Sequence, residues 1–180
     1  MLASLTALAL AAVAPPAQVP AATAFARLKS LVGTWRNAER PASPLRVRFS
    51  LTASGTVLVE EWLRGTQPHS LTLYHRDGDT LIATHYCPQG NQPRLALEAG
   101  KGPAIRFAFR DATDLDAARE SHQHALAFDL TEPARPVRSE SYRSATGDEP
   151  DRLVLARDTA PYFLPEWDRL SRGHRGEPLR

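Results

Sequence analysis

The chain has 180 residues, a formal net charge of +2 and a single cysteine, Cys87. This length suits one domain with a core of its own, and a lone cysteine excludes an intrachain disulfide. The basic residues are spread along the chain without a basic block or interleaved aromatic residues, which argues against nucleic-acid binding.

The first segment, Leu2 to Ala14, is apolar but too short to span a bilayer, and small residues and prolines follow it. This pattern is typical of a secretory signal peptide. We therefore predict a signal peptide at residues 1–21 and a periplasmic or secreted protein. No membrane span is expected after signal removal.

The next segments predict a short helix followed by many short strands. Phe25, Leu28 and Leu31 share one helical face between Ala21 and Leu31, and Gly33 ends that helix. Turn residues then separate ten strand-like runs. These runs are 34–36, 45–51, 56–64, 69–76, 80–86, 94–98, 104–109, 121–130, 137–143 and 152–157.

A meander of roughly ten antiparallel strands should close into a barrel, because closure removes exposed strand edges. We therefore predict an all-β, lipocalin-like antiparallel barrel over residues 22–158 with a short N-terminal helix. Residues 111–120 are expected to form a loop or one helical turn. Residues 159–180 are expected to be a partly disordered extension, with a short capping helix from Pro165.

Histidine and cysteine residues lie where inward-facing strand positions are expected. His85 and Cys87 project from one face of their strand. His122 and His124 continue an even-numbered apolar stripe that runs on through Leu126, Phe128 and Leu130. We predict that the four residues converge inside the barrel, because buried imidazoles need partners.

Two kinds of site fit this set. A divalent metal could be held by His85, Cys87, His122 and His124, and a polar pocket for an organic ligand is an equal alternative. Cys87 could also be a small buried hydrophobe or a nucleophile, and His85 could be satisfied by a hydroxyl such as that of Ser70 or Thr72.

Four further residues are candidates for the same site. Glu140 and Glu60 could face inward, although an outer, solvated position is the commoner one for a glutamate. Arg94, after a proline- and amide-rich loop, could pair with an anionic group of a ligand or clamp that loop. Tyr74 is expected to line the wall of the barrel.

Two segments carry a family resemblance. Leu31 to Trp35, in which a glycine and a tryptophan enter the first strand, resembles the opening of lipocalin-like and nitrobindin-type haem-binding barrels. Residues 71–130 resemble a family of exported bacterial domains of unknown function, which implies a lipocalin-like barrel with a His-Tyr-Cys and His-x-His set. The run 152–157 lacks the late histidine through which nitrobindins hold haem, and His174 lies in the C-terminal extension, so haem is disfavoured.

The sequence thus predicts an exported barrel that binds a small hydrophobic or amphiphilic molecule, or a metal. The alternative is an enzyme, a hydrolase or a metal-dependent one, that uses the same histidines and cysteine. No standard catalytic motif is present in the sequence.

Overall fold

The computed structural model describes residues 19–65, 67–99 and 102–159. Ten antiparallel strands follow one short helix and close into a barrel, in which β1 pairs with both β2 and β10. The predicted all-β barrel with an N-terminal helix is thereby confirmed. The elements are α1 (Ala21–Leu28), η1 (Lys29–Leu31), β1 (Gly33–Asn37), β2 (Leu45–Thr52), η2 (Ala53–Gly55), β3 (Val57–Arg64), β4 (Gln67–Asp77), β5 (Thr80–Tyr86), β6 (Gln92–Leu97), β7 (Ile105–Thr113), β8 (His122–Asp129), β9 (Val137–Ser144) and β10 (Gly147–Arg157).

Alternating burial gives the strands their inner and outer faces. On β7, Ile105 and Phe107 are buried whereas Arg106 between them is exposed, as expected for a strand with one face on a core. Tight turns join the strands. Asp77 and Thr80 are cross-strand partners, so only two residues form that turn, and Gly78 takes the positive φ of +59° that the turn requires.

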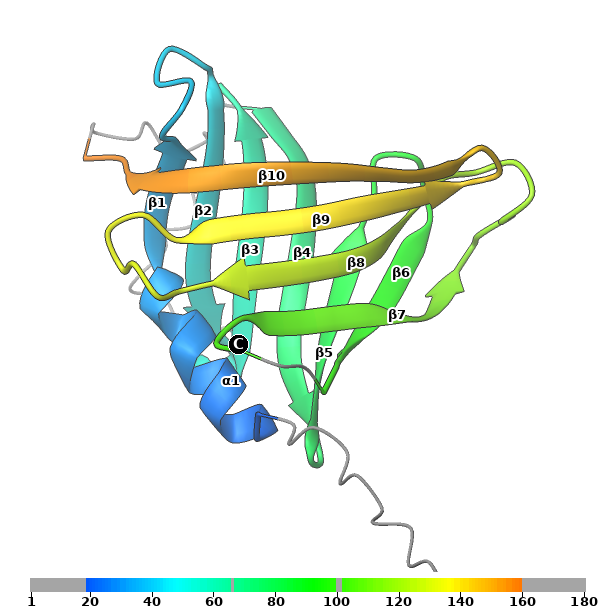
Figure 1. The fold of residues 1–180 in the computed structure, drawn as a ribbon, viewed down its shortest axis with the longest axis horizontal. Helices are drawn as coiled ribbons and strands as arrows, with labels where there is room; N and C mark the ends of the chain where they lie inside the picture. The colour runs from blue at the N-terminus through cyan, green and yellow to red at the C-terminus, as the bar shows by residue number, and fades with distance from the viewer. Residues whose placement is uncertain (1–18, 66, 100–101, 160–180) are drawn as a thin grey trace, which may run out of the picture.

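A meander places its connections alternately at the two ends of the barrel. Helix α1 lies at the end that carries the β4–β5 and β6–β7 connections (Figure 1), where Arg27 Nη2 donates a hydrogen bond of 2.8 Å to the Pro103 carbonyl. We call this the helix end. The opposite end, which carries the β3–β4, β5–β6, β7–β8 and β9–β10 connections, is called the far end.

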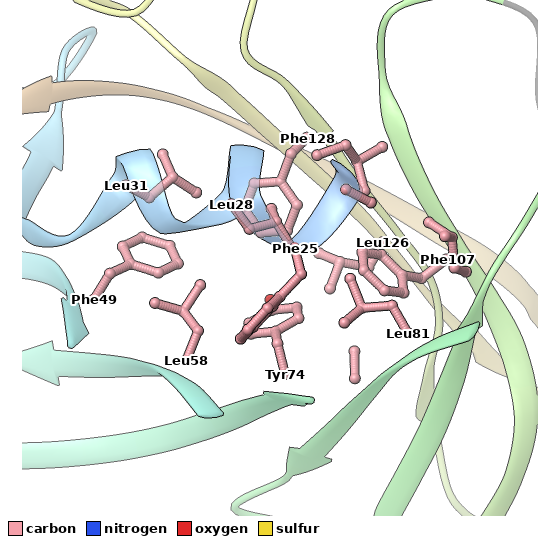
Figure 2. Close-up of a cluster of buried hydrophobic side chains, with 14 of the residues drawn as sticks. Phe25, Leu28, Leu31, Phe49, Leu58, Tyr74, Leu81, Phe107, Leu126 and Phe128 are labelled. Atoms are coloured by element: carbon pink, nitrogen blue, oxygen red, sulfur yellow. The ribbon is translucent and has the colours of Figure 1, made fainter. Parts of the chain in front are cut away.

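The helix end is filled with apolar side chains. Ala21, Ala24, Phe25 and Leu28 are the buried residues of α1, and Phe25 and Leu28 point into the barrel toward the inner faces of the strands (Figure 2). The strand residues that they meet include Phe49, Leu58, Tyr74, Leu81, Phe107, Leu126 and Phe128. The predicted amphipathic helix is therefore the plug of the barrel, and its apolar face is explained by burial.

The glycine and tryptophan at the start of β1 have a structural reason. The Trp35 indole donates a hydrogen bond of 2.6 Å to the Leu31 carbonyl, and the Arg157 guanidinium covers its ring at 3.9 Å from the centroid. Gly33 has a φ of +128°, and a Cβ at this position would overlap that guanidinium. Only glycine allows the close approach without strain.

Two predicted strand boundaries are wrong by more than two residues, and some predictions lie outside the described residues. Strand β7 continues through Thr113, into the predicted 111–120 loop, and β10 begins at Gly147 instead of residue 152. Residues 1–18 of the predicted signal peptide (1–21) and the predicted helix from Pro165 fall outside the described residues. Among those residues, no helix combines the length and apolar character needed to cross a membrane.

Candidate functional site: a polar cluster inside the barrel

Polar side chains gather inside the barrel beyond the apolar core. Glu60, Thr72 and His85 are successive cross-strand partners on β3, β4 and β5, so they form one row on the inner face. Residues of β8 and β9 complete the group from the other side of the barrel. We define the polar interior cluster as Glu60, Trp62, Thr72, His85, Gln123, Arg138, Glu140 and Tyr142.

Arg138 and Glu60 form the most deeply buried part of this cluster. Glu60 and Arg138 are 0% and 2% exposed, and Arg138 Nε lies 2.7 Å from Glu60 Oε1. The Nε hydrogen is not directed at that oxygen, so this contact is an ion pair without a hydrogen bond. The Trp62 indole donates to Glu60 Oε1 at 2.6 Å, the Tyr74 hydroxyl donates to Oε2, and Trp62 also stacks on the guanidinium.

Glu140 extends the ion pair toward the far end. Its Oε2 atom lies 3.0 Å from Arg138 Nη1 and accepts a hydrogen bond of 2.6 Å from Gln123 Nε2. Burial raises the pKa of Glu140, but the Arg138 charge and the hydrogen bonds from Gln123 and Arg138 outweigh this effect and lower it overall. Burial likewise lowers the pKa of Arg138, and the charges of Glu140 and Glu60 raise it overall. Arg138 and Glu140 are therefore both charged near neutral pH.

His85 bridges the interior as an uncharged imidazole. Its Nδ1 atom is 3.0 Å from the Thr72 hydroxyl, and its Nε2 atom is 3.1 Å from the Tyr142 hydroxyl of the opposite wall. Burial, followed by the Arg138 charge, lowers the pKa of His85 to about 4. From the sequence, a hydroxyl such as that of Thr72 is a predicted partner of an inward His85, and this contact is confirmed.

The Tyr142 hydroxyl and the Cys87 thiol are also uncharged near neutral pH. Burial and the neighbouring Glu140 raise the pKa of the Tyr142 hydroxyl well above its usual range. Cys87, just after β5, is half-buried, and burial raises the pKa of its thiol despite a hydrogen bond from the Gln89 backbone. The thiol is therefore not activated as a thiolate.

His122 and His124 form a pair of contacting imidazoles at the start of β8. The His122 Nε2 and His124 Nδ1 atoms are 3.3 Å apart, and the Phe109 ring contacts both imidazoles. Strand β8 has a register shift between Gln123 and Ala125, and His122 is 5% exposed. The shift pairs Gln123 with Tyr142 and leaves His124 without a cross-strand partner on β9. Gln123 therefore faces inward, where regular alternation along β8 predicts a histidine.

The structure does not bring the predicted quartet together as a metal site. His122 is the cross-strand partner of Arg143, whose exposed guanidinium pairs with Asp148 at 2.7 Å. In the part of the chain that the structure describes, no three side chains of histidine, cysteine, aspartate or glutamate are placed to hold one metal ion. The shared histidine and cysteine site, including its use by an organic ligand, stays a prediction.

The remaining candidates fall on both faces of the barrel. Tyr74 is fully buried and lines the inner wall, as predicted, and Glu60 and Glu140 face inward. Arg94 lies in β6, and its half-exposed side chain pairs with Asp111 and lines a cavity of about 410 Å³, so its contact with a ligand stays a prediction.

Sequence reasoning missed Arg138, Gln123 and Tyr142 as functional candidates. Arg138 and Tyr142 alternate with Glu140 on β9, and this charged and aromatic alternation was a usable signal. Gln123 gave no signal, because its inward position depends on the register shift.

Comparison with known proteins adds no relative to this picture, since neither a protein-family model nor a curated protein matches the chain.

Proposed function

We propose that this protein binds a small organic molecule noncovalently at the polar interior cluster. The molecule would enter the barrel from the far end. The observation that carries the proposal is the bridge from Thr72 through His85 to Tyr142, beside the Arg138 and Glu140 pair. These groups form a fixed set of donors and acceptors on opposite inner walls. Such convergent polar groups in an otherwise apolar interior are typical of ligand sites.

The energetics support a binding role. Removing the charges of Glu60, Arg138 and Glu140 from water costs several kcal/mol for each charge before the charges pair. Well-packed apolar side chains at the same positions would avoid this desolvation cost. A barrel selected for stability alone would continue its apolar core here, as it does around α1. The Glu140 side chain is 11% exposed and Tyr142 is half-buried, so the outer part of the cluster is within reach of a ligand.

The enzyme alternative has less support. Both ring nitrogens of His85 already have hydroxyl partners, and the Cys87 thiol is protonated near neutral pH. A cysteine nucleophile would need a thiolate, and one of the two hydroxyls that His85 contacts belongs to Tyr142, whose pKa is raised by burial. We therefore favour binding without covalent chemistry. Export to the periplasm or the medium remains part of the proposal, on the strength of the apolar segment from Leu2 to Ala14.

The test is calorimetric titration of the purified protein with a panel of small aromatic fragments that are neutral, anionic or cationic. Tyr142→Phe removes the hydroxyl that reaches His85, and Tyr86→Phe makes the same change on an exposed side chain. At least one fragment should bind, and Tyr142→Phe should change its affinity severalfold whereas Tyr86→Phe leaves it unaltered. The proposal is refuted if no fragment binds, or if binding is indifferent to Tyr142.

A further inference from the structure

Besides Arg138 Nε, which faces Glu60, two buried polar groups of the cluster have no hydrogen-bond partner within the described residues. Gln123 Oε1 is an acceptor and Arg138 Nη2 is a donor, and neither makes a hydrogen bond there. Gln123 is 0% exposed and Arg138 is 2% exposed, so solvent does not readily satisfy them. A buried polar group without a partner costs about 1–3 kcal/mol, so each one calls for an explanation.

The chemistry of the two groups is fixed by Glu140. Both Gln123 Nε2 and Arg138 Nη1 contact the same atom, Glu140 Oε2, at 2.6 and 3.0 Å. The carboxylate can only accept hydrogen bonds, so the NH₂ group of Gln123 must point toward it and the carbonyl oxygen must point away. A free acceptor and a free donor therefore flank one carboxylate.

The charges decide what kind of group fits beside them. Arg138 is in contact with two carboxylates, those of Glu60 and Glu140, and His85 is uncharged near neutral pH. The cluster thus has a formal charge of −1, from one guanidinium and two carboxylates. A further anion would add repulsion in a poorly solvated place, and an ammonium group would leave the Arg138 donor unused.

We propose that the cluster recognises an uncharged group that carries an acceptor and a donor side by side, such as a carboxamide or a lactam. The ligand's carbonyl accepts from Arg138 Nη2, and its N–H donates to Gln123 Oε1. This inference rests on the proposed binding function and names the ligand class of the same site. Carboxylates and amines are the classes that it excludes.

Four ligands of matched size test the assignment. Benzamide has both the carbonyl and the N–H, acetophenone keeps the carbonyl alone, benzoate replaces the amide by an anion, and benzylamine supplies a cation without a carbonyl. Titration should rank benzamide first, about tenfold tighter than acetophenone, because a tenfold ratio corresponds to about 1.4 kcal/mol, the value of one hydrogen bond. Benzoate and benzylamine should bind more weakly than acetophenone.

A matched pair of variants locates the donor contact. Gln123→Leu removes the free acceptor, so benzamide should lose its advantage and bind within about twofold of acetophenone, since one hydrogen bond is absent from both complexes. Gln67→Leu makes the same change at an exposed position and should keep the tenfold ratio. The ranking of the four ligands on the unaltered protein does not depend on how well Gln123→Leu folds.

The possible failures separate this inference from the proposed function. The amide assignment is overturned if benzoate binds as tightly as benzamide, if benzamide and acetophenone are equal, or if Gln123→Leu keeps the preference for benzamide. It is also overturned if none of the four binds while other fragments of the panel do. In each of these cases the binding function stands unless no fragment binds at all.

Discussion

The two ends of this barrel share one continuous sheet but differ in the side chains that fill them, which are apolar at one end and polar at the other. At the helix end, α1 inserts Phe25 and Leu28 among apolar side chains on the inner faces of the strands (Figure 2). Toward the far end, the same strands present ion pairs and hydrogen-bonded rings. The difference teaches that apolar packing stabilises one end, whereas paired polar groups fill the other, where we propose that a ligand binds.

The largest effect should come from breaking the buried ion pairs. Arg138→Met leaves the carboxylates of Glu60 and Glu140 buried beside an apolar side chain, which should lower the free energy of unfolding by about 3–5 kcal/mol. Chemical denaturation measures the loss. Adding Glu60→Gln and Glu140→Gln to the same protein should restore much of it, and a triple variant as unstable as the single one would contradict this explanation.

The helix end should lose a comparable amount through packing alone. Leu28 is fully buried in the apolar core, so Leu28→Ala should lower the free energy of unfolding by about 3 kcal/mol. The matched change Val32→Ala, at a residue 40% exposed, should stay within about 0.5 kcal/mol. Unlike Arg138→Met, Leu28→Ala should show this loss at every pH at which the protein folds.

The far end should respond to pH through His85. Its pKa is about 4 in the folded protein against 6.5 ordinarily, so the unfolded chain binds the proton more readily between these values. Stability should therefore fall as pH decreases from 6.5 to 4, by at most about 3 kcal/mol from this residue. Glu140, whose pKa is lowered, acts in the same direction only as the pH falls below its ordinary value of 4.5.

The measurement is the free energy of unfolding at several pH values between 6.5 and 5, for the unaltered protein and for His85→Gln. His85→Gln cannot take up this proton, so its free energy of unfolding should change less with pH than that of the unaltered protein. Parallel slopes would mean that His85 is not held uncharged inside the barrel.

A smaller effect is expected from the Tyr142 hydroxyl. Tyr142→Phe removes one hydrogen bond to His85 and should cost about 1 kcal/mol of stability. Tyr86→Phe, on the outer face, should be neutral within about 0.5 kcal/mol. Equal effects of the two changes in denaturation would argue against a structured far end.

The smallest effect should be that of Cys87→Ala. The thiol is half-buried and protonated, so its loss should change stability by less than about 1 kcal/mol and leave fragment affinity unaltered. Alkylation by iodoacetamide at pH 7 should be correspondingly slow. Rapid alkylation would restore the nucleophile as a serious alternative.

The strands and the helix could be predicted because their signals are local. Strand β5 begins and ends at the predicted residues, and the apolar face of α1 is where its periodicity put it. The histidine site could not be predicted in the same way. One register shift in β8 exchanges Gln123 for its histidine neighbours, and such an irregularity depends on pairing with β9 instead of on the local sequence.

Long-range partners were hidden for a related reason. Alternation alone suggests that Glu140 faces inward, but Arg138, which it contacts, also pairs with Glu60, a residue 78 positions before Arg138 in the chain. The order of the strands in the barrel brings these residues together, and the spacing of the residues in the sequence does not predict this contact. The same holds for Tyr142 and His85, whose rings meet across the interior.

The most direct test of the division between the two ends is a nuclear magnetic resonance titration with benzamide. The indole N–H of Trp62, which is bonded to Glu60, and the His85 ring should shift on binding, whereas the methyl groups of Leu28 and Leu58 should not. That pattern would place the ligand at the far end beside the polar interior cluster. Shifts of the two leucines without any change at Trp62 and His85 would contradict the account.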